Sequence, residues 1–429
     1  MERYEKYKPS RVTWLPEIPA HWEMSQAKYY FQYTTGFTPP TGAVEFYNGD
    51  ITWVTIADMN QKVVFDSTTK LSQTAIDKYN PDLTLKDSLL YSFKLSVGKV
   101  AYAGKDLFTN EAIISIMPNE KYDLRYFYFT LPEQLLQNAS ENIYGAKMLN
   151  QELIRNAAIC FPPKEEQTAV ADYLDKKTSH IDTLIANKQT LIELLKEERT
   201  AIINQAVTKG INSKAKLKPS GIEWLGDIPE HWGVKKLKYV ADVVLGKMLT
   251  NEDKGGYHLK SYLRAANLQR LNVDVSDVKE MWFTTNELSK LRLKKYDLLV
   301  SEGGEVGRTC IWNEELDECY IQNSVHKITM LHPNEPKYFL YLFYSYGQRG
   351  FFDSIVNRIS IAHLTGDKIK EILIIMPPAE EQSDINHYIE SHTARINATI
   401  SKIEKEIELL QEYRTALISE VVTGKIKVI

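Results

Sequence analysis

The strongest constraint on this chain is that two distinctive segments each occur twice. Residues 14–22, WLPEIPAHW, return as residues 224–232, WLGDIPEHW, 210 positions later. Residues 161–167, FPPKEEQ, return as residues 376–382, MPPAEEQ, 215 positions later. Two anchors at nearly one spacing indicate a tandem duplication, and the repeated unit is far longer than the roughly 20–50 residues of a solenoid repeat. Each copy is therefore expected to be a domain with its connector.

The bulk properties agree with two soluble domains. A length of 429 residues accommodates two domains plus connecting elements. The three cysteines, Cys160, Cys310 and Cys319, lack metal-type spacing and predict reduced structural thiols. No apolar signal region opens the chain and no run approaches the length of a membrane span, so we expect a cytoplasmic protein with no membrane role. The net charge of −4 disfavours a nonspecific nucleic-acid coat but permits a local basic face.

Each copy opens with a proline- and tryptophan-rich leading segment and continues into a globular stretch. The leading segments, 1–22 and 212–232, cannot form a long helix and offer tryptophan anchors, so we interpret them as hydrophobic clasps whose His21 and His231 pack or cap. The stretches 23–160 and 233–375 hold short β-branched and aromatic runs separated by turn residues. This pattern predicts an α+β globule with an irregular β-rich sheet in each copy.

A long helix is expected to close each copy, within 161–211 and 376–429. The Pro-Pro pair followed by Glu-Glu-Gln suits a first helical turn, because the amide dipoles there favour negative charge. Apolar residues at steps of three, four and seven then form one stripe, which in the first copy includes Leu174 and Leu191. An offset of 215 superimposes the two stripes and pairs their members, Ile181 with Ile396, Ile185 with Ile400, Leu195 with Leu410, and Ile202 with Leu417.

The matched stripes predict a helix pair. Two helices of about 35 residues, each roughly 50 Å long, are expected to pack as an antiparallel, coiled-coil-like pair separating the two domains. A third helix from a partner could also bind this seam, because a two-helix seam seldom buries its full apolar width.

Motifs for catalysis are weak. Gly303–Gly307 is glycine-rich but lacks the Gly-x-Gly-x-x-Gly order, and no phosphate-binding loop of the Gly-x-x-x-x-Gly-Lys-Ser/Thr type occurs. Residues 80–83, NPDL, match the Asn-Pro-Pro-Tyr/Phe loop of adenine methyltransferases only in part, and a turn is favoured. Asp242, Glu252 and Lys254 fit a loose metal-nuclease spacing, but the first copy has no counterpart. The nine histidines show no His-x-x-x-His pair. These features favour a recognition protein over an enzyme.

The two duplicated motifs together resemble those of the DNA-specificity subunit of type I restriction–modification systems. The resemblance covers essentially the whole chain. Residues 36–40, GFTPP, are similar to the family's Gly-Gly-Thr-Pro turn, with Phe37 in place of one glycine. The second copy departs further there, with GKMLT at 246–250, although YLRAAN at 262–267 and DLLVS at 297–301 are similar to family sequences.

The resemblance implies a division of labour. Each globular domain would be a target-recognition domain that reads one half of a bipartite, asymmetric DNA site. The helix pair would set the unread spacer and dock two methyltransferase subunits, which would carry S-adenosylmethionine and methylate adenine N6. A motor/nuclease subunit using ATP and Mg²⁺ would complete a restriction complex. The chain itself would be noncatalytic, with no cofactor or metal of its own.

DNA contacts are expected in loops rather than on the helix seam, with cations on phosphates and polar side chains on base edges. Arg264 and Asn267 are the best base-reading types, because Arg suits guanine and Asn suits adenine. Lys99 and Arg308 each follow a Val-Gly turn at matching positions of the two copies. The alternative interpretation of each candidate is a solvent-exposed charge or a turn residue that does not contact DNA. The candidates are Thr38, Tyr47, Lys94, Lys99 and Lys147 in the first domain and Lys247, Lys260, Arg264, Asn267, Arg308 and Asn323 in the second.

Two rival functions remain open at the level of sequence. One is a nuclease or methyltransferase with its own active site, and Asp242→Ala and Glu252→Ala would test it. The other is a scaffold that binds only proteins through its helices.

Overall fold

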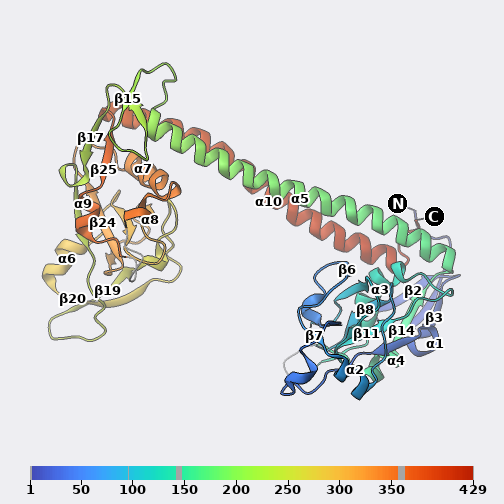
Figure 1. Ribbon diagram of the computed structural model, residues 1–429. Coiled ribbons are helices and arrows are strands. Elements are labelled where there is room, and N and C mark those ends of the chain that lie inside the picture. The colour runs from blue at the N-terminus through green and yellow to red at the C-terminus, as the bar shows by residue number, and fades with distance from the viewer. Residues whose placement is uncertain (1, 95, 142–146, 356–362, 429) are drawn as a thin grey trace. The chain divides into compact units, whose positions relative to one another are not determined.

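The computed structural model, whose helices and strands are labelled in Figure 1, describes residues 2–94, 96–141, 147–355 and 363–428. Its contacts divide the chain into two units: unit 1 is Met1–Lys188 with Lys405–Ile429, and unit 2 is Gln189–Glu404. Each unit mixes helices and strands, which confirms the α+β class. The sequence analysis treated each long helix as a segment separate from the globular domains. The contacts instead assign part of each long helix to unit 1 and part to unit 2. Among the described residues, no helix is long and apolar enough to cross a membrane.

Unit 1 is built on a five-stranded sheet. Its order is β4 (Tyr33–Thr35), β11 (Ile113–Ile116), β8 (Leu89–Ser92), β9 (Val100–Ala103), β6 (Val63–Val64). Alternate residues of β8 point to opposite faces. Leu89 and Tyr91 therefore join a core with helix α3 (Leu124–Leu136), while Leu90 joins a second cluster containing Val54. A three-stranded sheet stands beside it, in the order β10 (Phe108–Thr109), β5 (Ile51–Val54), β7 (Lys70–Leu71).

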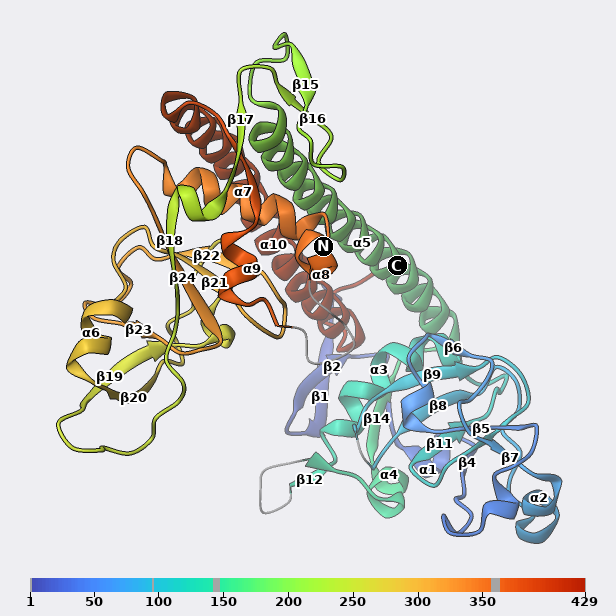
Figure 2. The same cartoon turned by 60° about the vertical axis from the view of Figure 1, so that its left-hand side comes forward.

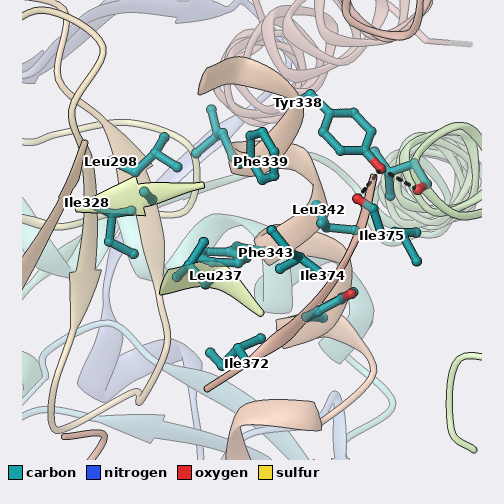
Figure 3. Packing of buried hydrophobic residues seen from close by; sticks show 14 of the residues in the cluster. Leu237, Leu298, Ile328, Tyr338, Phe339, Leu342, Phe343, Ile372, Ile374 and Ile375 are labelled. Atoms are coloured by element: carbon teal, nitrogen blue, oxygen red, sulfur yellow. Dashed lines mark hydrogen bonds between the residues drawn. The ribbon is translucent and has the colours of Figure 1, made fainter. Parts of the chain in front are cut away.

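Unit 2 repeats this plan. A four-stranded sheet has the order β18 (Ala241–Leu245), β24 (Val325–Met330), β21 (Leu298–Ser301), β22 (Thr309–Ile311), and a three-stranded sheet has the order β20 (Lys279–Phe283), β19 (His258–Leu263), β23 (Tyr320–Ile321). Helix α7 (Pro336–Gln348) packs Phe339 and Phe343 against Leu298 and Ile328 of the sheet, as Figure 3 shows. The Tyr338 hydroxyl of α7 lies within 3.2 Å of the Val207 carbonyl and 3.3 Å of the Ile375 carbonyl.

The remaining elements before the long helices are short. In unit 1 they are β1 (Tyr7–Val12), β2 (Leu15–Pro19), β3 (Glu23–Gln26), α1 (Ala27–Tyr30), η1 (Val44–Phe46), η2 (Ile56–Asp58), α2 (Gln73–Tyr79), β12 (Ser140–Glu141), β13 (Lys147–Met148), α4 (Gln151–Asn156) and β14 (Ala158–Phe161). In unit 2 they are β15 (Leu217–Pro219), β16 (Asp227–Pro229), β17 (Gly233–Lys236), η3 (Leu237–Tyr239), η4 (Ala265–Asn267), α6 (Thr285–Leu291), α8 (Phe351–Ile355), α9 (Gly366–Lys370) and β25 (Leu373–Met376).

The two duplicated sequence motifs bind each other. In unit 1, Glu166 of helix α5 (Lys164–Lys209) accepts hydrogen bonds from the Trp22 indole at 3.1 Å and from the Tyr4 hydroxyl, and its carboxylate lies 2.7 Å from His21 Nε2. In unit 2, Glu381 of helix α10 (Ala379–Val422) accepts a hydrogen bond from the Trp232 indole at 3.0 Å and lies 2.7 Å from His231 Nε2. The leading segments are therefore clasps, but polar hydrogen bonds as well as apolar packing hold them.

The glutamine of each motif has a separate structural task. Gln167 accepts a hydrogen bond from the Asp123 amide at 3.0 Å, at the start of α3. Gln382 accepts one from the Glu335 amide at 2.9 Å, at the start of α7. Each glutamine thus satisfies an amide at a helix start, where backbone donors lack intrahelical partners.

The long helices exceed the expected length. Helix α5 spans Lys164–Lys209, 46 residues, and α10 spans Ala379–Val422, 44 residues. The sequence stripe underestimated them because both ends pack into the domain cores, where Val170 and Val207 of α5 are buried. The helices run antiparallel, since Asp182 and Lys188 of α5 pair with Arg414 and Glu406 of α10, respectively.

The predicted seam positions lie at different depths. Ile181, Ile396, Ile400 and Leu417 are buried, whereas Ile185, Leu195, Ile202 and Leu410 are half-buried. Leu191, which its spacing assigned to the stripe, is exposed, and Ile192 is buried instead. A straight helix drifts by about 20° per heptad relative to a seven-residue repeat, so the buried face passes to the next residue along α5.

A glycine with positive φ follows the C-terminal end of each long helix and lies against the leading segment of its unit. In unit 2, α5 runs directly into Gly210, whose φ is 73° and where a side chain would meet Trp232. In unit 1, Gly424 is the second residue after the end of α10, with φ 72°, and a side chain there would collide with Pro19. Glycine suits both sites because it adopts positive φ without a Cβ clash.

Candidate nucleic-acid interface

Each domain presents a 3-10 helix directly after the middle strand of its three-stranded sheet. In unit 1, η2 follows β5, and the Asp58 carboxylate accepts hydrogen bonds from the Thr55 amide at 2.9 Å and the Thr68 amide at 2.9 Å. The hydroxyls of the same two threonines also donate to it, at 2.7 and 2.8 Å. Burial opposes ionisation, but these hydrogen bonds hold the pKa of Asp58 below its ordinary value.

The equivalent residue of unit 2 is Asn267, 209 positions later. Its side-chain oxygen accepts from the Arg264 amide at 3.1 Å, and its amide donates to the carbonyls of Asp274 and Asp277 at 3.0 and 3.1 Å. The residue is buried. Because these three bonds use both ends of the side chain, Asn267 braces a loop and does not present an adenine-reading edge, contrary to the sequence expectation.

The paired cations Lys99 and Arg308 occupy equivalent turns. The Lys99 amide donates to Ser92 Oγ at 3.0 Å, and the Arg308 amide donates to Ser301 Oγ at 3.0 Å. Both turns need a glycine with positive φ, and Gly98 and Gly307 supply it. The Val-Gly turn noted in the sequence is therefore a backbone turn with the same hydrogen bonds in both domains.

These two cations fasten their turns to the 3-10 helices. Lys99 Nζ donates to the Ile56 carbonyl at 3.1 Å and to Asn60 Oδ1 at 2.9 Å. Arg308 donates to the Ala265 carbonyl at 2.7 Å. Ile56 and Ala265 each begin their 3-10 helix, so the bracing contact is the same in both domains.

The other basic candidates of the second domain have carboxylate partners. These pairs are Lys247–Glu287 at 2.5 Å, Lys260–Glu318 at 2.5 Å, and Arg264–Asp277. The side chain of Lys247 is only 10% exposed, which disfavours contact with DNA in this conformation. Lys260 and Arg264 are more exposed, and exposed ion pairs contribute only about 0.2–1 kcal/mol, so a phosphate could replace either carboxylate at small cost. Figure 2 shows the part of unit 2 that carries β19, β20 and α6.

The remaining candidates divide into exposed and structural residues. Thr38 and Lys147 are exposed, and exposed Lys94 lies 3.9 Å from a carboxylate oxygen of Glu111. The Tyr47 hydroxyl instead donates to the Pro39 carbonyl at 2.5 Å. Asn323, the last of the set, is half-buried and accepts a hydrogen bond from Gln322 at 2.7 Å.

The loose nuclease spacing gains no geometric support. Asp242 lies on β18, and Glu252 and Lys254 lie in the exposed loop that follows. Within the described part of the chain, no group of three or more His, Cys, Asp or Glu side chains is placed to hold a metal ion. Asn80 ends helix α2 with φ 42°, so residues 80–83 begin as a helix-terminating turn.

Comparison with known families decides the identity of the chain. The sequence profile of the type I restriction modification DNA specificity domain matches residues 19–194 and again residues 229–409, which together form most of the chain. The chain belongs to the type I restriction–modification specificity family. The two matches also confirm the tandem duplication, and DNA recognition within such a system is the role of this chain.

Some specificity-subunit relatives match over nearly the whole chain and others over part of it. The MjaIX specificity subunit of Methanocaldococcus jannaschii is 23% identical over 436 residues, covering 97% of this chain and 96% of the relative. The EcoKI specificity subunit of Escherichia coli K12 is 24% identical over 286 residues, covering 63% and 56%.

Solved structures share the fold. A chain from work on complex assembly and conformational transition of the type I system has a TM-score of 0.72 at 14% identity, covering 95% of this chain and 99% of that one. The HsdS subunit of Thermoanaerobacter tengcongensis has a TM-score of 0.55 at 14% identity, covering 95% and 98%.

In this specificity subunit, sequence reasoning missed the residues that follow the 3-10 helices. Asn60 and Gln61 in the first domain correspond to Gln269 and Arg270 in the second, at an offset of 209, and all four are exposed. Amide and guanidinium groups are suited to reading base edges. Aligning the two copies between their anchors would have found these positions, because the equivalent loops carry different polar side chains.

Proposed function

We propose that each globular domain reads one half of a bipartite, asymmetric DNA site. The observation that carries this proposal is one scaffold with different polar side chains at equivalent exposed positions. The Gln61 amide suits an adenine edge, whereas Arg270, which stands at the equivalent position 209 residues later, suits guanine. Two domains with different readers imply unlike half-sites, in contrast to the palindrome read by a symmetric dimer.

The helix pair is proposed to set the unread spacer. Helices of 46 and 44 residues at about 1.5 Å per residue are each roughly 65–70 Å long, which bounds the spacing of the half-sites at about 20 base pairs of 3.4 Å. Buried seam residues such as Ile181 and Ile400 stiffen the pair.

The helix pair is also proposed to dock two methyltransferase subunits. In unit 2, a groove of about 550 Å³ between α5 and α10 is lined by Leu195, Ile202 and Ile396. Leu191 and Leu194 stand exposed on α5. An amphipathic partner helix is the natural occupant of such a groove. S-adenosylmethionine, ATP and Mg²⁺ belong to the partner subunits in this proposal, and the chain acts noncatalytically in the cytoplasm.

The proposal is tested by reconstituting the chain with its methyltransferase subunits and mapping methylated adenines on a random DNA library. The expected product is one asymmetric, two-part motif that appears only when the chain is present. Methylation that is unchanged without the chain would contradict the adaptor role.

The enzymatic rival is tested on the same DNA with the purified chain alone. We expect neither cleavage nor methylation, and Asp242→Ala and Glu252→Ala are expected to leave the mapped motif unchanged. Activity of the chain alone that either substitution abolishes would establish the rival instead.

A further inference from the structure

The helix pair contains one pseudosymmetric contact whose charge differs between the two units. In unit 1, Arg414 donates two hydrogen bonds to the Asp182 carboxylate, at 2.8 and 3.3 Å. The offset of 215 that aligns the helices maps these residues onto Arg199 and Asn397 in unit 2. There Arg199 donates to Asn397 Oδ1 at 2.8 Å. The same geometry thus pairs arginine with a carboxylate in one unit and with a neutral amide in the other.

The positive charge of Arg199 is therefore not compensated by a carboxylate at this contact. Among its contacts in the described structure, Asn397 is the partner of one terminal nitrogen, while the Nε atom is buried and has no hydrogen-bond partner. A buried donor without an acceptor costs about 1–3 kcal/mol, more when it is charged. An anion that reached this guanidinium would relieve that cost.

The guanidinium borders a cavity of about 380 Å³ within unit 2. Arg199 and Asn397 come from the long helices, Lys337 and Tyr344 from α7, and Arg270 from the loop after η4. Three of the lining side chains are therefore cations, and the described lining contains no carboxylate.

Two of these cations are already neutralised from outside the cavity. Arg270 pairs with Glu305, and Lys337 lies 2.6 Å from Glu390. Neither glutamate lines the cavity. Arg199 is thus the source of uncompensated charge, and the amides of Asn272 and Asn313 add neutral donors at the same wall.

We propose that this cavity binds a phosphate group, held by Arg199. The planar guanidinium presents donors that match the oxygens of a phosphate, and none of the described lining residues is a carboxylate that would compete for it. The phosphate comes either from the backbone of bound DNA, which rests on the proposed DNA-reading function, or from a small free phosphate compound. Because Asp182 neutralises the equivalent Arg414 in unit 1, the proposed site belongs to unit 2.

Two substitutions abolish the uncompensated positive charge of Arg199 in different ways. Arg199→Gln deletes the cation, whereas Asn397→Asp supplies the carboxylate that unit 1 already has and preserves the helix-pair contact. Asp182→Asn removes the carboxylate of the equivalent contact in unit 1, leaves the amide acceptor that unit 2 has, and is the matched control. Melting temperatures establish that each variant is folded, and Asn397→Asp keeps the test decisive even where Arg199→Gln does not fold.

The measurements use the full chain assembled with its methyltransferase subunits. Affinity for a duplex carrying the mapped site is measured over a range of salt concentrations. If the phosphate belongs to DNA, both unit 2 variants should flatten the slope of log K against log salt by about 0.9, the value for one phosphate contact, and Asp182→Asn should not flatten it. If the phosphate is free, slopes stay equal, but inorganic pyrophosphate raises the melting temperature of the wild type and not of the unit 2 variants.

Equal slopes together with equal pyrophosphate shifts would overturn the proposal. Failure of the wild type to bind any mapped site would instead refute the DNA-reading function. The pyrophosphate comparison would still decide whether the cavity binds phosphate.

Discussion

Single residues show how one scaffold carries two chemistries. Asp58 and Asn267 stand at the same place in the two domains and both tie a 3-10 helix to its neighbouring loop. The carboxylate accepts four hydrogen bonds and makes its loop sensitive to acid, whereas the amide is indifferent to pH. Its residue type indicated Asn267 as a base reader, because a sequence does not reveal that both ends of its amide are already hydrogen-bonded.

This difference predicts a pH-dependent stability for unit 1. The lowered pKa of Asp58 stabilises the fold above the ordinary carboxyl pKa of 3.8, and that contribution is lost as pH falls through the lower folded value. Asp58→Asn should destabilise unit 1 at pH 7 by on the order of 2 kcal/mol, since an amide cannot accept all four bonds. Thermal melts should show the deficit shrinking at pH 3. An equal deficit at both pH values, or a similar pH trend for exposed Asp50→Asn, would contradict this role.

The clasp glutamates provide a second residue-scale prediction. Glu166→Ala leaves the buried Trp22 indole and the Tyr4 hydroxyl without their acceptor, which should cost about 3 kcal/mol. Its exposed neighbour supplies the matched control, Glu165→Ala, which should cost less than about 0.5 kcal/mol. Denaturant unfolding measures both, and equal effects of the two changes would refute the clasp.

At the scale of elements, periodicity predicted the existence of the helices better than their extent. Ile181 and Ile400 are buried as a seam requires, but Leu191 is exposed because the buried face drifts along a straight helix. The helix ends extend beyond the stripe since residues such as Val207 pack into a domain core rather than onto the other helix. Tertiary contacts of this kind leave no periodic signal.

The seam makes its own prediction. Ile400 is buried between the helices, so Ile400→Asn should lower stability by about 3 kcal/mol or more through lost apolar contact and an unsatisfied amide. Thr399→Asn changes the exposed preceding residue and should be nearly neutral. Melting temperature and binding of the methyltransferase subunits are the measurements. Unchanged values for Ile400→Asn would rule out the seam.

At the scale of the whole molecule, the duplicated anchors predicted the architecture because they are the contacts that hold each unit together. Glu166 meets Trp22, and Glu381 meets Trp232, so both anchors were retained in each copy. The DNA-reading loops could not be located in the same way. Their side chains differ between copies, and several predicted cations, such as Lys247, are held by carboxylates distant in sequence.

Modular reading by two independent domains is the central claim, and exchanging one domain tests it most directly. Residues 233–375 are replaced by the corresponding domain of another specificity subunit, and methylated adenines are mapped in cells carrying the chimera and its methyltransferase. One half of the target should change, while the other half and the spacer length stay the same. A chimera that folds and methylates but changes both halves of its target would contradict the claim.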